Sequence, residues 1–270
     1  MELVTMHTHT NYTGHGFGTV AELVDAAAAA KLGAIAVTEH YPMSATMDPE
    51  NVVSMAWNRL PDYLIDIAAA AAAHPEMQVI PGCEIDWLGA HEDRDFSALD
   101  FSNFIHVLGS VHYLDGWAFD DPAQEPHWHD VGVDSVWRRY FEVWCQAASC
   151  TDMPFTCMAH PDLVKKFGYR PSFNPQALYD EAAEAVQSSG RMVEVNTSGL
   201  TYPCAELFPA PDLLRTFCRA GIPCSIGTDA HEPALVDRNL MPGLAAMYEA
   251  GYRCVTVPTP TGDRRQIALE

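Results

Sequence analysis

Basic side chains are scarce in this 270-residue chain, which has 15 Lys and Arg residues against 36 Asp and Glu residues. The formal net charge at pH 7 is −21, and the basic residues do not cluster beyond three adjacent pairs. Such a field repels nucleic acid and anionic membrane surfaces. We therefore expect no membrane partner, and nucleic acid is not the first choice of partner.

Long hydrophobic runs are also missing. Runs such as Ile67 to Ala73 are far shorter than a membrane span, which needs about 20 apolar residues. No signal peptide precedes the first expected strand. The eight cysteines form neither a C-x-x-C motif nor a dense framework, which predicts reduced, mostly buried thiols. Together these absences predict a cytoplasmic protein.

Motifs of several other phosphate-handling sites are absent. No cysteine is followed six residues later by arginine, and there is no G-x-x-x-x-G-K segment. Asp93-Arg94-Asp95 forms a D-x-D, but it follows the polar LGAHE and not a hydrophobic strand. These observations disfavour a cysteine nucleophile, a nucleotide phosphate loop and an aspartate nucleophile.

The chain alternates short β-rich runs with Ala-rich or amphipathic stretches. The expected strands are Leu3–Met6, Ala34–Thr38, Gln78–Ile85, Phe104–His112, Pro154–Ala159, Met192–Asn196 and Pro223–Gly227, with Cys254–Val257 as an additional candidate. The expected helices are Val20–Leu32, Asn51–Ala73, Ser135–Ser149, Asn174–Ser189, Pro211–Ala220 and Ala234–Ala250. This alternation predicts parallel strands with helical crossovers. The polar tail Thr259–Glu270 gives no prediction.

Candidate metal ligands follow nearly every expected strand. They are His7, His9, His40, Glu84, His112, His160, Asp229 and His231. In an open sheet the edge strands would lie far apart, whereas a closed barrel gathers all carboxyl ends around one mouth. The pattern therefore predicts an α/β barrel in a single domain, residues 1–270.

The spacing of these residues favours metal binding. His7 and His9 are two apart, so on a strand they face the same side with Cα atoms roughly 6.6 Å apart. Asp229 and His231 repeat this spacing, and the two oxygens of Glu84 can bridge two cations. Imidazoles suit transition metals such as Zn and Fe. Counting His15 in the loop after the first expected strand, seven histidines and two carboxylates exceed what one ion can use, which predicts two or three metals.

Other histidines have simpler interpretations. Taken alone, His15 in the Gly-rich YTGHGFG is typical of a solvated loop. His106 lies six residues before His112, roughly 20 Å along a strand, and is expected to pack near the foot of the barrel. His127 and His129 lie in a Pro/Asp-rich segment, where a lid or rim position is expected.

A set of motifs runs in order along essentially the whole chain: MHTHT with a following loop histidine, TEHYP, GCEID, LGSVHYLDGW, AHPDLVKKF, VNTSGL and GTDAH. This set resembles the PHP (polymerase and histidinol phosphatase) family, particularly its histidinol-phosphate phosphatases. The resemblance implies a distorted TIM-like (β/α)7 barrel with a trinuclear metal site. It would place one metal on His7, His9, Glu84 and Asp229, a second on Glu84, His112 and His160, and a third on His15, His40 and His231.

The resemblance also implies a metal-dependent phosphomonoesterase. The expected reaction is hydrolysis of L-histidinol phosphate to L-histidinol and phosphate, in histidine biosynthesis. A hydroxide bridging the metals would attack phosphorus without a phosphoenzyme. Glu84, Asp229 and His231 are the candidate catalytic residues. The metals are expected to be Zn, Fe or Mn, because spacing does not choose among them.

Candidate substrate contacts follow the metal motifs. Lys165 and Lys166 could meet a phosphate at the mouth or lie on a solvated helix face. Trp117 and Phe119 fall where the family has a substrate-covering loop, with core packing as the alternative. Asn196 could face the site or cap the backbone.

The sequence differs from the family pattern at one place, and two other functions remain as alternatives. Thr201-Tyr202 stands where histidinol-phosphate phosphatases commonly carry a basic residue. The first alternative is a PHP phosphoesterase that acts on nucleotides or other small phosphate esters. The second is a non-catalytic metal-binding interaction module, although all nine family ligand positions are occupied in this chain.

Overall fold

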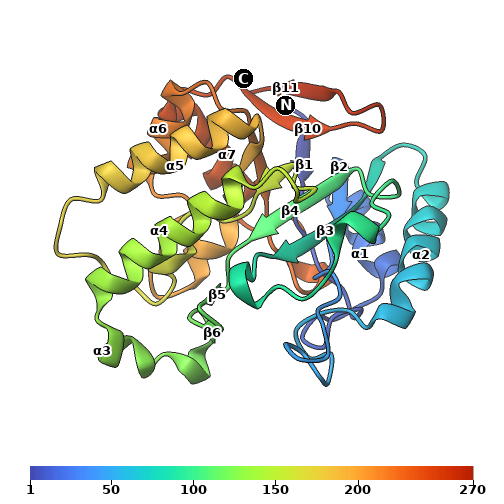
Figure 1. The fold of residues 1–270 in the computed structure, drawn as a ribbon. Helices are drawn as coiled ribbons and strands as arrows, with labels where there is room; N and C mark the ends of the chain where they lie inside the picture. Colours follow the sequence, from blue (N-terminus) through green and yellow to red (C-terminus); the bar gives the residue numbers. More distant parts are fainter. Residues whose placement is uncertain (270) are drawn as a thin grey trace.

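Seven parallel strands form one sheet in the order β1-β2-β3-β4-β7-β8-β9 (Figure 1). The computed structural model describes residues 1–269, so Glu270 of the polar tail lies outside the described residues. The strands are β1 (Leu3–Thr5), β2 (Leu32–Val37), β3 (Gln78–Asp86), β4 (His106–Ser110), β7 (Cys157–Met158), β8 (Met192–Asn196) and β9 (Cys224–Gly227).

The first and last strands of this sheet are joined. Met6 N–H donates to the carbonyl of Ile226 over 2.8 Å, and Asp229 N–H donates to the carbonyl of His7 over 2.9 Å. Thr8 and Ala230 continue the pairing as a parallel bridge. The sheet therefore closes into a TIM-like barrel, and the predicted fold class is confirmed.

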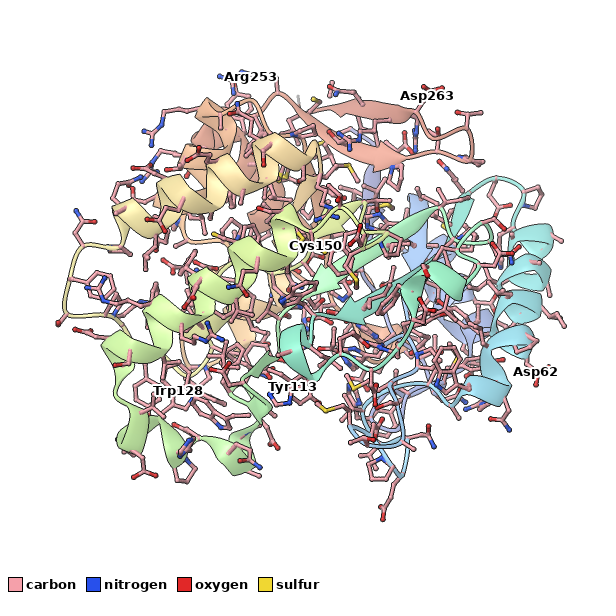
Figure 2. The ribbon with its side chains drawn as sticks, viewed as in Figure 1. Asp62, Tyr113, Trp128, Cys150, Arg253 and Asp263 are labelled. Atoms are coloured by element: carbon pink, nitrogen blue, oxygen red, sulfur yellow. The ribbon has the colours of Figure 1, made fainter. Side chains whose placement is uncertain are left out.

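Helices surround the barrel and fill the connections between its strands (Figures 1 and 2). They are α1 (Val20–Ala29), α2 (Leu60–Ala73), α3 (His127–Val131), α4 (Val133–Ser149), α5 (Gln176–Ser189), α6 (Pro211–Arg219) and α7 (Leu240–Ala250). In α4, Trp137, Phe141 and Trp144 repeat at helical spacing and are buried, which gives this helix an apolar stripe against the core. No helix in residues 1–269 is long and apolar enough to cross a membrane.

Two small hairpins complete the molecule. One pairs β5 (Tyr113–Leu114) with β6 (Trp117–Ala118) just after β4. The other pairs β10 (Cys254–Pro258) with β11 (Arg264–Ala268), so the additional strand is present and part of the tail forms its partner. Both nitrogens Nη1 and Nη2 of Arg265 contact the Glu2 carboxylate at 2.8 and 2.9 Å, which ties this hairpin to the start of β1.

The segment before α2 differs from the expected helix Asn51–Ala73, because the α-helix begins only at Leu60. The buried carboxylate of Asp48 accepts hydrogen bonds from the N–H groups of Val52, Val53 and Ser54, which hold this segment in a turn. Such local bonds compete with helix formation. Residues 51–56 therefore remain free to approach the mouth of the barrel.

All eight cysteines are free thiols, as expected from their spacing. Cys83, Cys157 and Cys224 are buried on barrel strands, and the other five are partly buried.

Candidate metal centre

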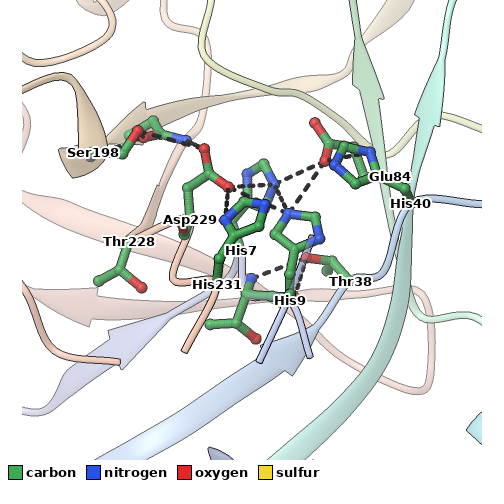
Figure 3. Close-up of polar contacts among 12 residues, drawn as sticks. His7, His9, Thr38, His40, Glu84, Ser198, Thr228, Asp229 and His231 are labelled. Carbon is green, nitrogen blue, oxygen red and sulfur yellow. Dashed lines mark hydrogen bonds and ion pairs between the residues drawn. The ribbon is translucent and has the colours of Figure 1, made fainter. Parts of the chain in front are cut away.

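The carboxyl ends of the barrel strands bring the predicted ligands together. Beyond β1 the chain stays extended alongside β9, where His9 N–H donates to the carbonyl of Ala230 over 2.7 Å. This extended backbone turns the imidazoles of His7 and His9 to the same side, and both are completely buried. Figure 3 shows them between Asp229 and His231 on one side and Glu84 and His40 on the other.

The imidazole nitrogens of His7 and His9 each lie close to two carboxylate oxygens. His7 Nε2 lies 3.0 Å from His9 Nε2, 3.2 Å from Glu84 Oε2 and 3.6 Å from Asp229 Oδ1. His9 Nε2 lies 3.3 Å from each of the same two carboxylate oxygens. Tetrahedral coordination at about 2.0–2.1 Å separates neighbouring donors by roughly 3.3–3.4 Å. The donor atoms of His7, His9 and Asp229 therefore have a spacing that suits one transition-metal ion, and Glu84 Oε2 lies next to the two imidazoles.

Glu84 lies at the centre of the cluster and uses both oxygens. Oε2 lies 3.3 Å from His40 Nδ1 in addition to His7 and His9. Oε1 lies 3.0 Å from His160 Nε2 and 3.8 Å from His112 Nε2. A carboxylate in this position can contact cations on both of its sides.

Among the described residues, three groups of donors are close enough to hold an ion, with one ligand atom from each residue and these atoms within 4.8 Å of one another. They are His7, His9 and Asp229; His40, Glu84 and His112; and His9, His40 and His231. The ring of His15 lies 4.9 Å from that of His231 and 5.2 Å from that of His40, centroid to centroid. The nine predicted ligands thus converge, but in this geometry His9 and His40 lie between neighbouring groups.

Hydrogen bonds hold several of these imidazoles in one tautomer. Nδ1–H of His231 donates to the carbonyl of Asp229 over 3.0 Å, and Nδ1–H of His15 donates to the carbonyl of Val52 over 3.2 Å. Nδ1–H of His112 donates to Asp86 Oδ1 over 2.6 Å. Because a carbonyl only accepts, Nε2 of His231 and His15 keeps its lone pair when the ring is neutral. Such anchored imidazoles are typical of metal ligands.

Burial and neighbouring carboxylates shift the pKa values of these imidazoles in opposite directions. Burial lowers the pKa of His9, but hydrogen bonds with Asp229 and Glu84 outweigh it and raise the pKa to about 9. Burial acts likewise on His112, whose pKa is raised to about 10 by the charge and hydrogen bond of Asp86. For His231 burial dominates and lowers the pKa to about 3. The carboxylates therefore attract cations, while His231 is a neutral donor at pH 7.

A pocket of about 430 Å³ opens above the cluster. Glu84, His112, His160, Asp229 and His231 form part of its lining, together with residues from the β6 loop and the 51–56 segment. The cluster is therefore accessible to a small molecule from the mouth of the barrel.

The two predicted lysines lie in different places. Lys166 lines the pocket, and its Nζ donates to Asp120 Oδ2 and to the Asp120 carbonyl, each over 2.9 Å. Lys165 is completely buried, and its Nζ contacts Asp162 Oδ2 at 2.8 Å and Glu206 Oε2 at 2.9 Å. These carboxylates hold its ammonium group outside the lining of the pocket, so the geometry opposes the expected substrate contact of Lys165.

The remaining candidate substrate contacts lie around the pocket and not in its lining. Phe119 is completely buried and Trp117 is half-buried; their rings belong to an aromatic cluster with Trp128. This placement corresponds to the packing alternative. Asn196 is buried below the site, where its Nδ2 donates to Glu194 Oε2 over 3.2 Å and to Asp229 Oδ2 over 3.3 Å. Its Oδ1 accepts from Ser198 N–H, so it both caps the backbone and contacts a ligand residue.

Thr201 and Tyr202, which stand where a basic residue is common in the family, make different contacts in the structure. Thr201 Oγ1 donates to the carbonyl of Ser198 over 2.7 Å, and Tyr202 lines the pocket with its ring 4.9 Å from Lys166 Nζ. Among the described residues that line the pocket, Lys166 is the only Lys or Arg.

Sequence reasoning missed three buried carboxylates behind the ligands. Asp86 Oδ1 lies 2.6 Å from His112 Nδ1, Glu194 Oε1 lies 2.9 Å from His7 Nδ1, and Glu39 Oε2 lies 3.9 Å from His9 Nδ1. It also missed Asp120, which lines the pocket. For Glu39, Asp86 and Glu194 the available signal was a charged residue within or directly after an apolar strand: the first two lie in the quoted motifs TEHYP and GCEID, and Glu194 directly precedes VNTSGL.

Comparisons with known proteins identify the family of the chain. A family model described as the PHP domain matches residues 5–198. A relative from Deinococcus radiodurans, named "Probable histidinol-phosphatase", is 32% identical over 256 residues, which cover 94% of this chain and 96% of the relative.

Two solved structures share the fold. Histidinol phosphate phosphatase from Lactococcus lactis, complexed with zinc, L-histidinol and phosphate, has a TM-score of 0.80 at 20% identity and covers 96% of this chain and 97% of its own. A protein from Listeria monocytogenes to which histidinol phosphatase activity has been ascribed has a TM-score of 0.81 at 22% identity and covers 88% and 99%. With its PHP-domain match and its curated relative of nearly equal extent, this chain belongs to the PHP family.

Proposed function

We propose that the protein is a metal-dependent phosphomonoesterase that hydrolyses L-histidinol phosphate to L-histidinol and phosphate. The observation that carries the reaction class is the convergence of seven imidazoles and two carboxylates around Glu84 under an open pocket. The substrate is supported by the relative with 32% identity over nearly the whole chain. Small phosphate monoesters fit the size of the pocket better than polymers do, and the net charge of −21 opposes nucleic acid.

Two to three divalent ions would be held by the nine converging residues: His7, His9, His15, His40, Glu84, His112, His160, Asp229 and His231. The donor set suits Zn, Fe or Mn, since it combines neutral imidazoles with carboxylates. When bound, such ions activate water as a nucleophile and neutralise charge on phosphoryl oxygens.

The chain's own side chains supply the remaining functions. Lys166 presents an ammonium group to the pocket, and its hydrogen bonds to Asp120 fix the position of that charge. A phosphoryl oxygen can accept from the same ammonium, which has three donors. Glu84 and Asp229 hold negative charge beneath the pocket, and His231 offers a neutral imidazole at its edge, 30% exposed. We assign catalytic positions to Glu84, Asp229 and His231 on this basis.

The test is steady-state phosphate release by protein whose metal content has been quantified. L-histidinol phosphate is compared with nucleoside monophosphates, other monoesters and a phosphodiester. We expect a strong preference for L-histidinol phosphate, lost on chelation, restored by metal, and reduced at least 100-fold in His9→Ala. The matched control is His74→Ala, since its hydrogen-bond partners Asp25 and Glu76 are exposed and neither is a predicted ligand.

Other outcomes assign the alternatives. Metal-dependent release from nucleotides or other small esters alone would retain the metal centre and discard the histidinol substrate. Metal-loaded protein that hydrolyses no phosphoester would overturn the enzymatic assignment and favour the interaction module.

A further inference from the structure

Glu194 is a buried carboxylate inside the barrel, one layer below the metal cluster. It lies on β8, and its side chain is 1% exposed. Oε1 accepts from His7 Nδ1–H over 2.9 Å. Oε2 accepts from the main-chain N–H of His160 over 2.9 Å and from Asn196 Nδ2 over 3.2 Å. Both oxygens are therefore occupied by donors of the chain, and two of the three donors belong to His7 and His160, predicted ligands that contact different oxygens of Glu84.

The neighbouring strand leaves space for this arrangement. Gly227 on β9 pairs with Asn196 on β8, next to Glu194. A Cβ atom at Gly227 would lie 2.1 Å from Glu194 Oε1 and 2.4 Å from His7 Cβ. Side chains do not approach this closely, so a glycine is required here for Glu194 and His7 to meet.

The backbone conformation of His160 is a second feature that depends on its hydrogen bond with Glu194. Its φ angle is +25°, in a region that non-glycine residues rarely adopt. Such a conformation is unfavourable and persists only where surrounding contacts hold it. The hydrogen bond from His160 N–H to Glu194 is a contact of this kind, and it turns His160 Nε2 to within 3.0 Å of Glu84 Oε1.

We propose that Glu194 is a positioning residue that fixes the imidazole of His7 and the main chain of His160 at the same time. It keeps the Nδ1 proton of His7 in place, so that Nε2 faces the ions, and it holds His160 on the other side of Glu84. One carboxylate thereby sets donors of two ion positions while contacting neither ion. This inference rests on the proposed metal centre, but not on the identity of the substrate.

The variant Glu194→Gln keeps the shape and loses one acceptor. The amide oxygen can serve His7 or His160, but the NH2 group cannot accept from either. We expect the affinity for zinc to fall about 10- to 100-fold and the bound metal per chain to decrease at fixed free zinc. The visible spectrum of the cobalt(II)-loaded protein should change, because donor geometry changes. Glu184→Gln, on the exposed face of α5, is the matched control.

Two further measurements separate positioning from loss of folding. Circular dichroism of the metal-free variant should match wild type, and Glu194→Asp, which keeps the charge on a shorter side chain, should recover part of the zinc affinity. In wild-type protein labelled with 15N-histidine, long-range 1H–15N spectra of the zinc-loaded form should show His7 protonated at Nδ1 and coordinated at Nε2. This measurement uses wild-type protein, so its result does not depend on whether a variant folds.

Zinc coordination through His7 Nδ1 would overturn the proposal, as would zinc affinity and a cobalt spectrum in Glu194→Gln equal to those of wild type. These measurements use metals alone. Failure to hydrolyse L-histidinol phosphate would therefore remove the proposed function without touching this inference, and unchanged metal binding in Glu194→Gln would do the reverse.

Discussion

Two histidines of the cluster, His9 and His112, hold a proton more tightly than a free imidazole because carboxylates lie beside them. The pKa values of His9 and His112 are raised to about 9 and about 10. At a pH below its raised pKa, each of these imidazoles is protonated, so a metal ion must displace the proton in order to bind. We predict that zinc loading at pH 7 releases more than one proton per chain and weakens as pH falls from 9 to 6. Titration calorimetry in buffers of different ionisation enthalpy measures this release; heats independent of the buffer would contradict it.

Lys166 is the residue at which substrate binding can be separated from metal binding. We predict that Lys166→Met lowers kcat/KM for the phosphate ester roughly 10- to 100-fold, as expected for loss of a charged hydrogen bond. Bound metal should stay equal to wild type, because Lys166 contacts Asp120 and no predicted ligand. Lys31→Met, at an exposed position, is the control. An unchanged kcat/KM in Lys166→Met would remove this lysine from substrate binding.

Individual ligands could be predicted from sequence because strand alternation and strand ends are local properties. His7, His9 and Asp229 follow directly from them. The different positions of Lys165 and Lys166 could not be predicted in this way, because the side chains of adjacent residues point in different directions. One of the two carboxylates that pair with Lys165 belongs to Glu206, 41 positions further along the chain. Which oxygen approaches which imidazole likewise depends on contacts between distant strands.

Among the elements, the end of α4 depends on one side chain. Arg191 is buried directly before β8, and its guanidinium donates to the carbonyls of Ala147, Ala148, Met153 and Phe155, among others. We predict that Arg191→Met lowers the free energy of unfolding by roughly 2–4 kcal/mol, because buried carbonyls lose a charged donor. Urea denaturation of metal-free protein measures this.

The control for this change is Arg215→Met, which removes an exposed pair with Asp212 on α6. It should alter stability by less than about 0.5 kcal/mol. Equal effects of the two substitutions would show that Arg191 does not secure the end of α4.

Most elements followed from periodicity, and the exceptions have local causes. The strands β2, β3, β8 and β9 lie where apolar runs predict them, within a few residues. The Asp48 turn and Pro61 in the first turn of α2 delay that helix to Leu60. The polar tail gave no pattern because β11 has one buried side chain, Ile267, and depends on pairing with β10. Short helix α3 was hidden by its polar composition, since Trp128 alone anchors it in the core.

For the molecule as a whole, the net charge of −21 opposes the approach of an anionic ester. Salt screens this repulsion over a Debye length of about 10 Å at 0.1 M. We predict that kcat/KM for a dianionic monoester without a cationic group rises about two- to threefold between 20 and 200 mM NaCl. The ester with a cationic leaving group should respond less. A fall with salt, at constant metal content, would mean that the positive charge at the site governs encounter.

The bond between β1 and β9 also imposes an order on events during synthesis. His7 and His9 leave the ribosome more than two hundred positions before Asp229 and His231, and their donor sets stay incomplete until the last barrel strand has docked beside the first. Metal captured by the nascent chain would therefore be held by fewer atoms and exchange readily. Full metal occupancy can arise only after chain elongation has passed β9, so the metal content of freshly made protein reports how far its maturation has advanced.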